Sequence, residues 1–276
     1  MPKFIVGARL HDYGKGSPDE LFGRVAADGF AAVQLAYKKC VPSVRSYADV
    51  TDTLVAETVA AEKAHSIQVA VLGTYVELAI NDESRLKNAA DFKSQLAVCK
   101  ALGAGCIATE TTSMEKQPAG TTREEAQELL CRSLADILPA AEALGVTVAV
   151  EPVTYHSMNS AAATRHILDT MRSPNLKVIF DMSNLVDAGN VGVQDRIWND
   201  VSELLGDQIV AVHFKGQAFA PDGGLLHTSL EDSLTDYAGA FAMLRQLPQD
   251  ALPVLREEAV PARAASDIAF MRGFFS

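Results

Sequence analysis

Eight short apolar runs recur along the chain, and each is followed by a longer segment with a helical pattern. The runs are FIVGARL (4–10), FAAVQLA (30–36), IQVAVLG (67–73), GCIATET (105–111), VTVAVE (146–151), LKVIFD (176–181), IVAVHF (209–214) and LPVLREE (252–258). Nearly continuous apolar runs are typical of parallel strands that are buried on both faces. No linker-like composition divides the 276 residues. The sequence therefore predicts the α/β class, with one closed (β/α)8 barrel domain over 1–276.

Turn and capping residues mark where the helices between these runs begin and end. Ser17–Glu20 and Thr121–Glu124 each read as a helix start with a capping box, in which a hydroxyl and a glutamate three residues later bond reciprocally. Glycines end three of the helices, and Pro248 ends a helix through 238–247; the three glycines are Gly103, Gly145 and Gly206. An open, doubly wound sheet is the alternative, but no GxGxxG fingerprint follows the first run.

Charge and composition restrict the partners that the chain can have. It carries 24 basic and 35 acidic residues, a formal net charge of −11, and this argues against a nucleic-acid partner. No stretch has the roughly 18 apolar residues of a membrane span, and residues 1–14 do not resemble a signal peptide. The four cysteines form no CxxC pair and are interpreted as buried thiols in a reducing, cytoplasmic environment.

Four consecutive strands are expected to end in residues that can bind a metal ion. Glu151 ends the fifth run, Asp181 the sixth, His213 lies near the end of the seventh and Glu257 near the end of the eighth. In a barrel, the carboxyl ends of the strands meet on one rim, where active sites are built. Charged side chains there are costly unless they are paired or hold an ion. The pattern therefore predicts a metal site on that rim.

These same segments resemble the xylose isomerase-like superfamily of sugar isomerases and epimerases, whose fold is a single TIM barrel. The likeness covers most of the chain and is carried by the order and spacing of five segments, which are Phe92–Ala104, Val150–Pro152, Phe180–Asn184, Val212–Lys215 and Leu255–Glu257. The superfamily also includes endonuclease IV-type enzymes, but the additional histidines of that multi-zinc branch do not follow the third or fourth run here.

The resemblance implies that Glu151, Asp181, His213 and Glu257 hold one divalent ion. A donor set rich in carboxylates suits Mn²⁺ best, with Mg²⁺, Co²⁺ or Zn²⁺ as alternatives. It implies a sugar isomerase or epimerase that moves a proton next to a carbonyl through a metal-stabilised enediolate. In that mechanism Glu151 and Glu257 act as the acid–base pair. The substrate is a small sugar or polyol, and relatives of this kind commonly form homo-oligomers.

Other polar residues on the predicted rim are candidates for binding substrate. These are His11, Glu110, His156, Asn184 and Lys215. Asn184 stands where the family pattern often has histidine, so it can bond a hydroxyl but cannot shuttle a proton.

Two further departures from the family pattern lie nearby. Gln34 replaces a frequent glutamate and Leu230–Ser233 replaces a Gly-rich turn, and neither is expected to contact the four proposed ligands. The long segment that follows the seventh run and includes His227 is interpreted as a flap over the site.

Two alternatives to the isomerase remain open from the sequence. A dehydratase or lyase that acts on an inosose-type keto-polyol would use the same metal site and then expel a hydroxyl group. A non-catalytic barrel that only binds a sugar would need neither a metal nor two glutamates. The product mass separates the first alternative from the isomerase, and metal content separates the second.

Overall fold

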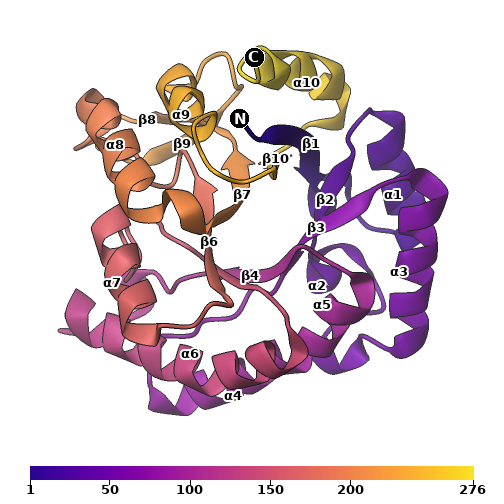
Figure 1. Cartoon of the computed structure of the whole chain (residues 1–276), viewed down its shortest axis with the longest axis horizontal. Coiled ribbons are helices and arrows are strands. Elements are labelled where there is room, and N and C mark those ends of the chain that lie inside the picture. The colour runs from indigo at the N-terminus through magenta and orange to yellow at the C-terminus, as the bar shows by residue number, and fades with distance from the viewer.

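The computed structural model describes all residues, 1–276, and its eight parallel strands close into one barrel with the helices outside it (Figure 1). The barrel strands are β1 (Lys3–Arg9), β2 (Ala32–Leu35), β3 (Gln68–Gly73), β4 (Cys106–Glu110), β5 (Val148–Glu151), β6 (Leu176–Asp181), β7 (Ile209–Phe214) and β10 (Ala251–Arg256). Each strand pairs with the next in the chain, and β1 pairs with β10 to close the ring. The predicted (β/α)8 barrel is confirmed, and the open sheet is excluded.

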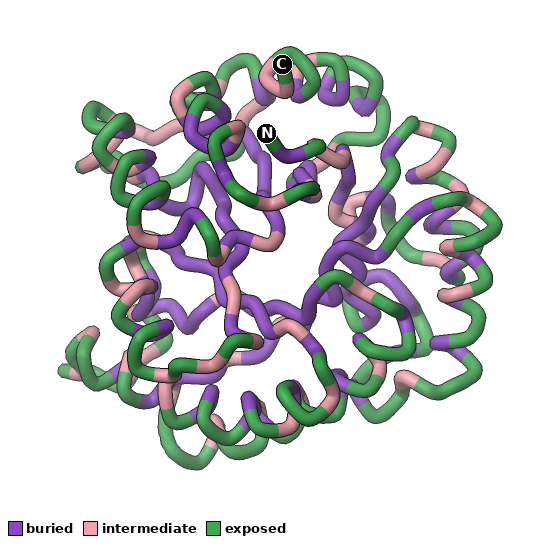
Figure 2. The backbone as a smooth tube through the Cα atoms, viewed as in Figure 1, coloured by how far each residue is buried: buried purple, intermediate pink, exposed green.

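The helices form the outer ring of the molecule. They are α1 (Pro18–Ala27), α2 (Tyr37–Cys40), α3 (Asp52–His65), α4 (Asp82–Ser94), α5 (Leu96–Leu102), α6 (Arg123–Leu144), α7 (Ala161–Met171), α8 (Gln194–Leu205), α9 (Tyr237–Leu244) and α10 (Ala264–Arg272). In Figure 2 the strands at the centre are buried, whereas the helices expose their outer sides. None of the helices combines the length and apolar character that a membrane crossing requires.

The helix ends agree with the capping signals in part. Ser17 and Glu20 form the predicted capping box of α1. The box of α6 lies one residue later than predicted, because Thr122 is the cap and pairs with Glu125. Gly103 and Gly145 end their helices in the left-handed conformation that suits glycine.

Two predicted helix ends are wrong in detail. Gly206 keeps a helical conformation, with φ −51°, because the chain continues from α8 into a short 3₁₀ turn. The helix predicted through 238–247 is α9, which ends at Leu244, before the turn that contains Pro248.

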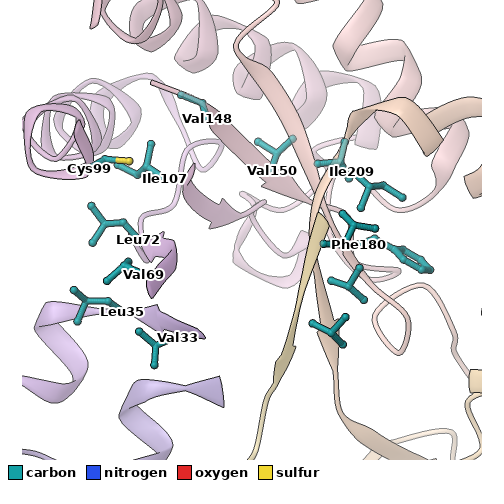
Figure 3. Close-up of a cluster of buried hydrophobic side chains, with 14 of the residues drawn as sticks. Val33, Leu35, Val69, Leu72, Cys99, Ile107, Val148, Val150, Phe180 and Ile209 are labelled. Atoms are coloured by element: carbon teal, nitrogen blue, oxygen red, sulfur yellow. The ribbon is translucent and has the colours of Figure 1, made fainter. Parts of the chain in front are cut away.

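Alternation along the strands separates an outer core from the barrel interior. In β2, Val33 and Leu35 belong to the large apolar cluster between strands and helices, part of which Figure 3 shows. Ala32, by contrast, belongs to a separate cluster of mostly small residues. That cluster contains Ala32, Ala70, Val71, Cys106, Ala108, Ala149, Ile179, Ala211 and Leu255. Because side chains alternate between the two faces of a strand, residues two positions after Ala32, Ala108, Ala149, Ile179 and Ala211 also face the barrel axis.

Gly7 lies where the barrel interior is too crowded for a side chain. Its strand neighbours in β2 and β10 are Ala32 and Leu255. A Cβ atom at position 7 would lie 2.5 Å from the Ala32 carbonyl oxygen and 2.5 Å from a Leu255 methyl carbon. We therefore expect Gly7→Ala to lower the free energy of unfolding in urea by about 1–3 kcal/mol, as overpacking does. Gly192→Ala is the control, because no atom lies within 4 Å of its Cβ position. Equal stability of the two variants would contradict this interpretation.

The segment after β7, which the sequence suggests as a flap, folds into an antiparallel hairpin. Its strands are β8 (Gly216–Phe219) and β9 (Leu225–Thr228). The Gln217 side-chain amide anchors the base of the hairpin by donating to the carbonyl oxygens of Ser183 and Val186, at 2.9 and 3.2 Å. Since both acceptors lie in the loop after β6, the hairpin is attached to the segment that follows Asp181.

Candidate functional site

The strand ends deliver the predicted ligands to one place because all of them face the barrel axis. Glu151 follows Ala149 by two residues in β5, and Asp181 follows Ile179 by two in β6. The same spacing separates His213 from Ala211 in β7. Glu257 lies directly after β10, two residues beyond Leu255 of the inner cluster. The mostly small residues of the inner cluster therefore lie deeper in the barrel, and the side chains of the site lie closer to the carboxyl ends of the strands.

Three of the four predicted ligands form one compact group. Glu151, Asp181 and His213 are buried, and each offers a ligand atom within 4.8 Å of the other two. Glu257 is not part of that group, but its Oε1 lies 3.4 Å from His213 Nδ1. Glu151 Oε2 lies 3.1 Å from the same nitrogen. The imidazole therefore joins the group of three to Glu257.

The backbone after β6 orients the carboxylate of Asp181. The amide nitrogens of Ser183 and Asn184 donate to its Oδ1 at 2.7 and 3.0 Å. Its Oδ2 forms an ion pair with Lys215 Nζ at 2.9 Å, without hydrogen-bond geometry. The Asn184 side chain donates to Glu151 Oε1 at 2.6 Å. Asn184 therefore orients a proposed ligand, which its position in the family pattern did not indicate.

Lys215 is the principal cation of the site and lies between two of its carboxylates. Its Nζ is 2.9 Å from Asp181 Oδ2 and 3.4 Å from Glu257 Oε2. Burial lowers the pKa of Lys215, but the charges of Asp181 and Glu257 outweigh burial and hold that pKa well above its ordinary value. These contacts place the Lys215 ammonium among the proposed ligands, and substrate contact by Lys215 stays a prediction.

The charges of the site act on one another strongly. Burial lowers the pKa of His213, yet Glu257 and Glu151 raise it to about 9. Burial raises the pKa of Glu257, but His213, Lys215 and Arg9 reverse the shift and hold the pKa at about 2. The carboxylates thus favour the positively charged forms of His213 and Lys215, as they would favour a cation.

Glu110 extends the acidic cluster on the neighbouring strand. It ends β4, where it is paired in register with Glu151. Burial, together with the charges of Glu151 and Glu257, raises the pKa of Glu110 to about 7. Its placement on the rim beside the group agrees with the prediction.

The two predicted rim histidines lie farther from the group. His11 packs edge-on against Tyr75, with ring centroids 5.9 Å apart. His156 is buried, and its Nδ1 lies 3.4 Å from Thr111 Oγ1. Burial lowers the pKa of His11 to about 3 and that of His156 to about 4. Both rings are therefore neutral near pH 7, and neither contacts Glu151, Asp181 or His213.

Gln34 contacts a proposed ligand, contrary to the expectation from the sequence. Its Oε1 lies 2.6 Å from His213 Nε2, although the two residues are 179 positions apart. The available signal was the alternation in β2, because Gln34 follows Ala32 of the inner cluster by two residues. Arg9, which the sequence also did not single out, lies 3.8 Å from Glu257.

The residues present fit a divalent cation. Asp181 Oδ2 and His213 Nδ1 are buried and make no hydrogen bond, so both have a lone pair or proton without a hydrogen-bonding partner. A cavity of about 10 Å³, the size for one water molecule, is lined by Gln34, Tyr75, Glu151 and His213 among others, but not by Asp181 or Glu257. Carboxylate oxygens with one imidazole nitrogen form a donor set of the kind that Mn²⁺ and related ions accept.

A larger cleft of about 470 Å³ is formed mainly by the loops after β5 and β6 and by the β8–β9 hairpin. Asn184, which bonds Glu151, lines the cleft together with Tyr155, Gln217, Phe219 and Leu225. Its volume lies within the range of small-molecule sites, and apolar and hydrogen-bonding side chains alternate along its walls. A cleft of small-molecule size thus reaches Asn184, the residue that bonds Glu151.

A family model described as the xylose isomerase-like TIM barrel matches residues 22–273 of the chain. Among solved structures, the 3-keto-D-glucoside 4-epimerase YcjR from E. coli is 17% identical, with a TM-score of 0.72, over 98% of this chain and 100% of that chain. The IOLI protein with a bound zinc atom is 16% identical, with a TM-score of 0.77, over 99% and 98%.

D-Psicose 3-epimerase, solved in the presence of D-fructose, is 15% identical, with a TM-score of 0.72, over 100% of this chain and 99% of that chain. At such low identities the likeness to these structures establishes the fold alone. Among curated proteins, none matches this sequence.

Proposed function

The chain belongs to the xylose isomerase-like TIM-barrel family, and on this premise we propose that it is a divalent-metal-dependent sugar isomerase or epimerase. One observation carries the proposal: Glu151 and Glu257 approach the same nitrogen of His213, at 3.1 and 3.4 Å. They come from β5 and the end of β10, which β6 and β7 separate in the barrel. Two carboxylates thus face one small space from different directions.

Such a pair suits proton transfer at a carbon atom next to a carbonyl group. That carbon is very weakly acidic, so the reaction needs a base and a means of stabilising the negative charge that develops. Glu151, Asp181, His213 and Glu257 would hold a divalent ion, which would supply Lewis-acid stabilisation of that charge. One of the two glutamates removes the proton, and the other returns it.

The surrounding residues hold these groups in position. Asn184 fixes Glu151 through its 2.6 Å hydrogen bond, and Lys215 fixes Asp181 and Glu257 through its ion pairs. Lys215 and Asn184 also present donors toward hydroxyl groups of a bound sugar. His11, His156 and Glu110 complete the rim to which the substrate binds.

The 470 Å³ cleft supports a small sugar or polyol as substrate. Relatives in structure include an epimerase of a 3-keto-D-glucoside and an epimerase of D-psicose, so keto-sugars are the first compounds to test. Mn²⁺ is the proposed ion because three carboxylates and one imidazole form an oxygen-rich set.

A cytoplasmic location belongs to the same proposal. Cys40, Cys99 and Cys106 are buried thiols, whereas Cys131 is only partly buried, so the interpretation of all four cysteines as buried is wrong for Cys131. Burial raises the pKa of Cys40 and of Cys99 to about 12, which makes them unreactive and suits a reducing compartment.

The test is exchange of substrate hydrogen with solvent. Purified protein is incubated in D₂O with a panel of ketoses and inososes and with Mn²⁺, and each product is analysed by mass and by NMR. We expect an isomer of the substrate whose formula is unchanged except for one deuterium, at the carbon next to the carbonyl. We expect EDTA to abolish the exchange and Mn²⁺ to restore it. A product lighter by one water would indicate the dehydratase. Exchange that persists after removal of all metal would contradict the proposal.

A further inference from the structure

Gln34 lies against the rear of the proposed metal ligand His213. Its Oε1 is 2.6 Å from His213 Nε2. Both residues are buried: Gln34 is 4% exposed and His213 is 1% exposed. The other ring nitrogen, Nδ1, faces Glu151 and Glu257. The imidazole is therefore held between an amide on one side and carboxylates on the other.

The amide of Gln34 is itself held in place by Tyr75, which lies two residues after the end of β3. Its Nε2 donates to the hydroxyl of Tyr75 at 2.9 Å. Gly73 leaves room for this contact, because a Cβ atom there would lie 3.3 Å from the Tyr75 ring and 3.4 Å from Gln34 Nε2. A side chain at position 73 would press on both partners. Gln34 on β2, Gly73 at the end of β3 and Tyr75 in the loop after it thus form one support behind His213.

The direction of the bond to His213 decides which ring nitrogen can bind an ion. Only the neutral imidazole binds a metal ion, and it has one N–H and one lone pair. A carbonyl oxygen at Nε2 can only accept, so it requires the proton on Nε2. The lone pair then lies on Nδ1, which points at the acidic group. If the amide were turned round, Nδ1 would carry the proton and could not bind a metal ion.

We propose that Gln34 is a positioning residue that keeps the proton of His213 on Nε2 and thereby presents Nδ1 to a divalent cation. This inference rests on the proposed function for the identity of the ligand, and not for the hydrogen bond itself. Groups that orient a metal-binding histidine commonly contribute 10–100-fold to metal affinity. Glutamine does this without adding a further negative charge to a site that already contains Glu110, Glu151 and Glu257.

The first test compares metal affinity in variants of similar shape. Methionine is close to glutamine in length and lacks the acceptor, so we expect Gln34→Met to weaken Mn²⁺ or Zn²⁺ binding by about 10–100-fold at unchanged stoichiometry. Gln34→Glu keeps an acceptor and is expected to restore an affinity close to that of the wild type. Gln249→Met is the matched control, because Gln249 bonds the Ile209 carbonyl at the opposite end of β7. Titration calorimetry measures all four proteins, and thermal unfolding verifies that each is folded.

The second test reads the proton directly and needs no metal. It is carried out above pH 9, where the imidazole of His213 is neutral and carries a single ring proton. In protein labelled with ¹⁵N-histidine, the His213 signals are assigned by their loss in His213→Ala. We expect a slowly exchanging proton on His213 Nε2 in the wild type and in Gln249→Met, and its loss in Gln34→Met.

The outcomes separate this inference from the proposed function. Wild-type affinity in Gln34→Met, or equal weakening in Gln34→Glu, would overturn the positioning role. A wild type that binds no divalent ion would overturn the proposed function. In that case the Nε2 proton alone decides the role of Gln34, which is refuted if the proton is absent from the wild type or persists in Gln34→Met.

Discussion

Replacing Glu257 by glutamine is expected to lower turnover by roughly 10²–10⁴-fold, the contribution of a general acid or base. Glutamine keeps the shape and the ability to accept a hydrogen bond but cannot take up or release a proton. The same result is expected for Glu151→Gln, because both glutamates are needed when one removes the proton and the other returns it. Steady-state kinetics on a substrate identified by deuterium exchange measure the effect.

Stability and exchange measurements separate lost chemistry from lost structure. Glu257→Gln removes one carboxylate from a site that also contains Lys215 and Arg9, so circular dichroism and thermal unfolding are needed to verify the fold. Glu142→Gln is the control; Glu142 lies near the end of α6, where it accepts a hydrogen bond from Ser173. Its turnover should equal that of the wild type. Activity of either site variant within a few-fold of wild type would refute the assignment of the acid–base pair.

Removing two ligands together is expected to abolish metal binding. The wild type should hold about one divalent ion per chain after dialysis against Mn²⁺, as a single group of ligands implies. Asp181→Ala combined with His213→Ala leaves Glu151 as the only member of the compact group. We expect the ion content to fall to background and turnover to fall with it. Elemental analysis of the dialysed proteins measures the ion content.

A histidine outside the site provides the control for this loss. His166 is exposed on α7, so His166→Ala removes an imidazole without touching the group. It should retain the full ion content. If the wild type takes up no Mn²⁺, Mg²⁺, Co²⁺ or Zn²⁺, the metal-dependent reaction is refuted and a sugar-binding barrel becomes the better hypothesis. If the double variant keeps its ion, the ligands lie elsewhere.

The strand pattern predicted the barrel because burial on both faces leaves a strong local signal. Each of the eight apolar runs overlaps one barrel strand, and their ends differ by at most two residues. The resemblance to the xylose isomerase-like family is confirmed over 22–273. Glu151, Asp181 and His213 could be placed together from sequence because parallel strands of a barrel end on one rim. This inference needs only the direction of the strands and no knowledge of contacts between side chains.

Other features could not be predicted, either because the local sequence offers two equivalent choices or because they depend on partners that are distant in the chain. The capping box of α6 uses Thr122, although Thr121 has the same side chain and also precedes a glutamate by three residues. The hairpin of β8 and β9 does not have the continuous buried apolar run of a barrel strand, and its Leu225 and Leu226 are exposed. Its position depends on Gln217 bonding the loop after β6. Local pattern carries no information about such bonds.

By itself the sequence determined the closed barrel, the order of its elements and the rim on which the acidic residues and His213 meet. These follow from alternation and from strand direction, which are local properties of the chain. Only the tertiary structure decided that Gln34 lies behind His213, that Lys215 lies between Asp181 and Glu257, and that Glu257 stands apart from the compact group of three. These contacts depend on barrel closure, because closure sets the distances between side chains on strands that are far apart in sequence.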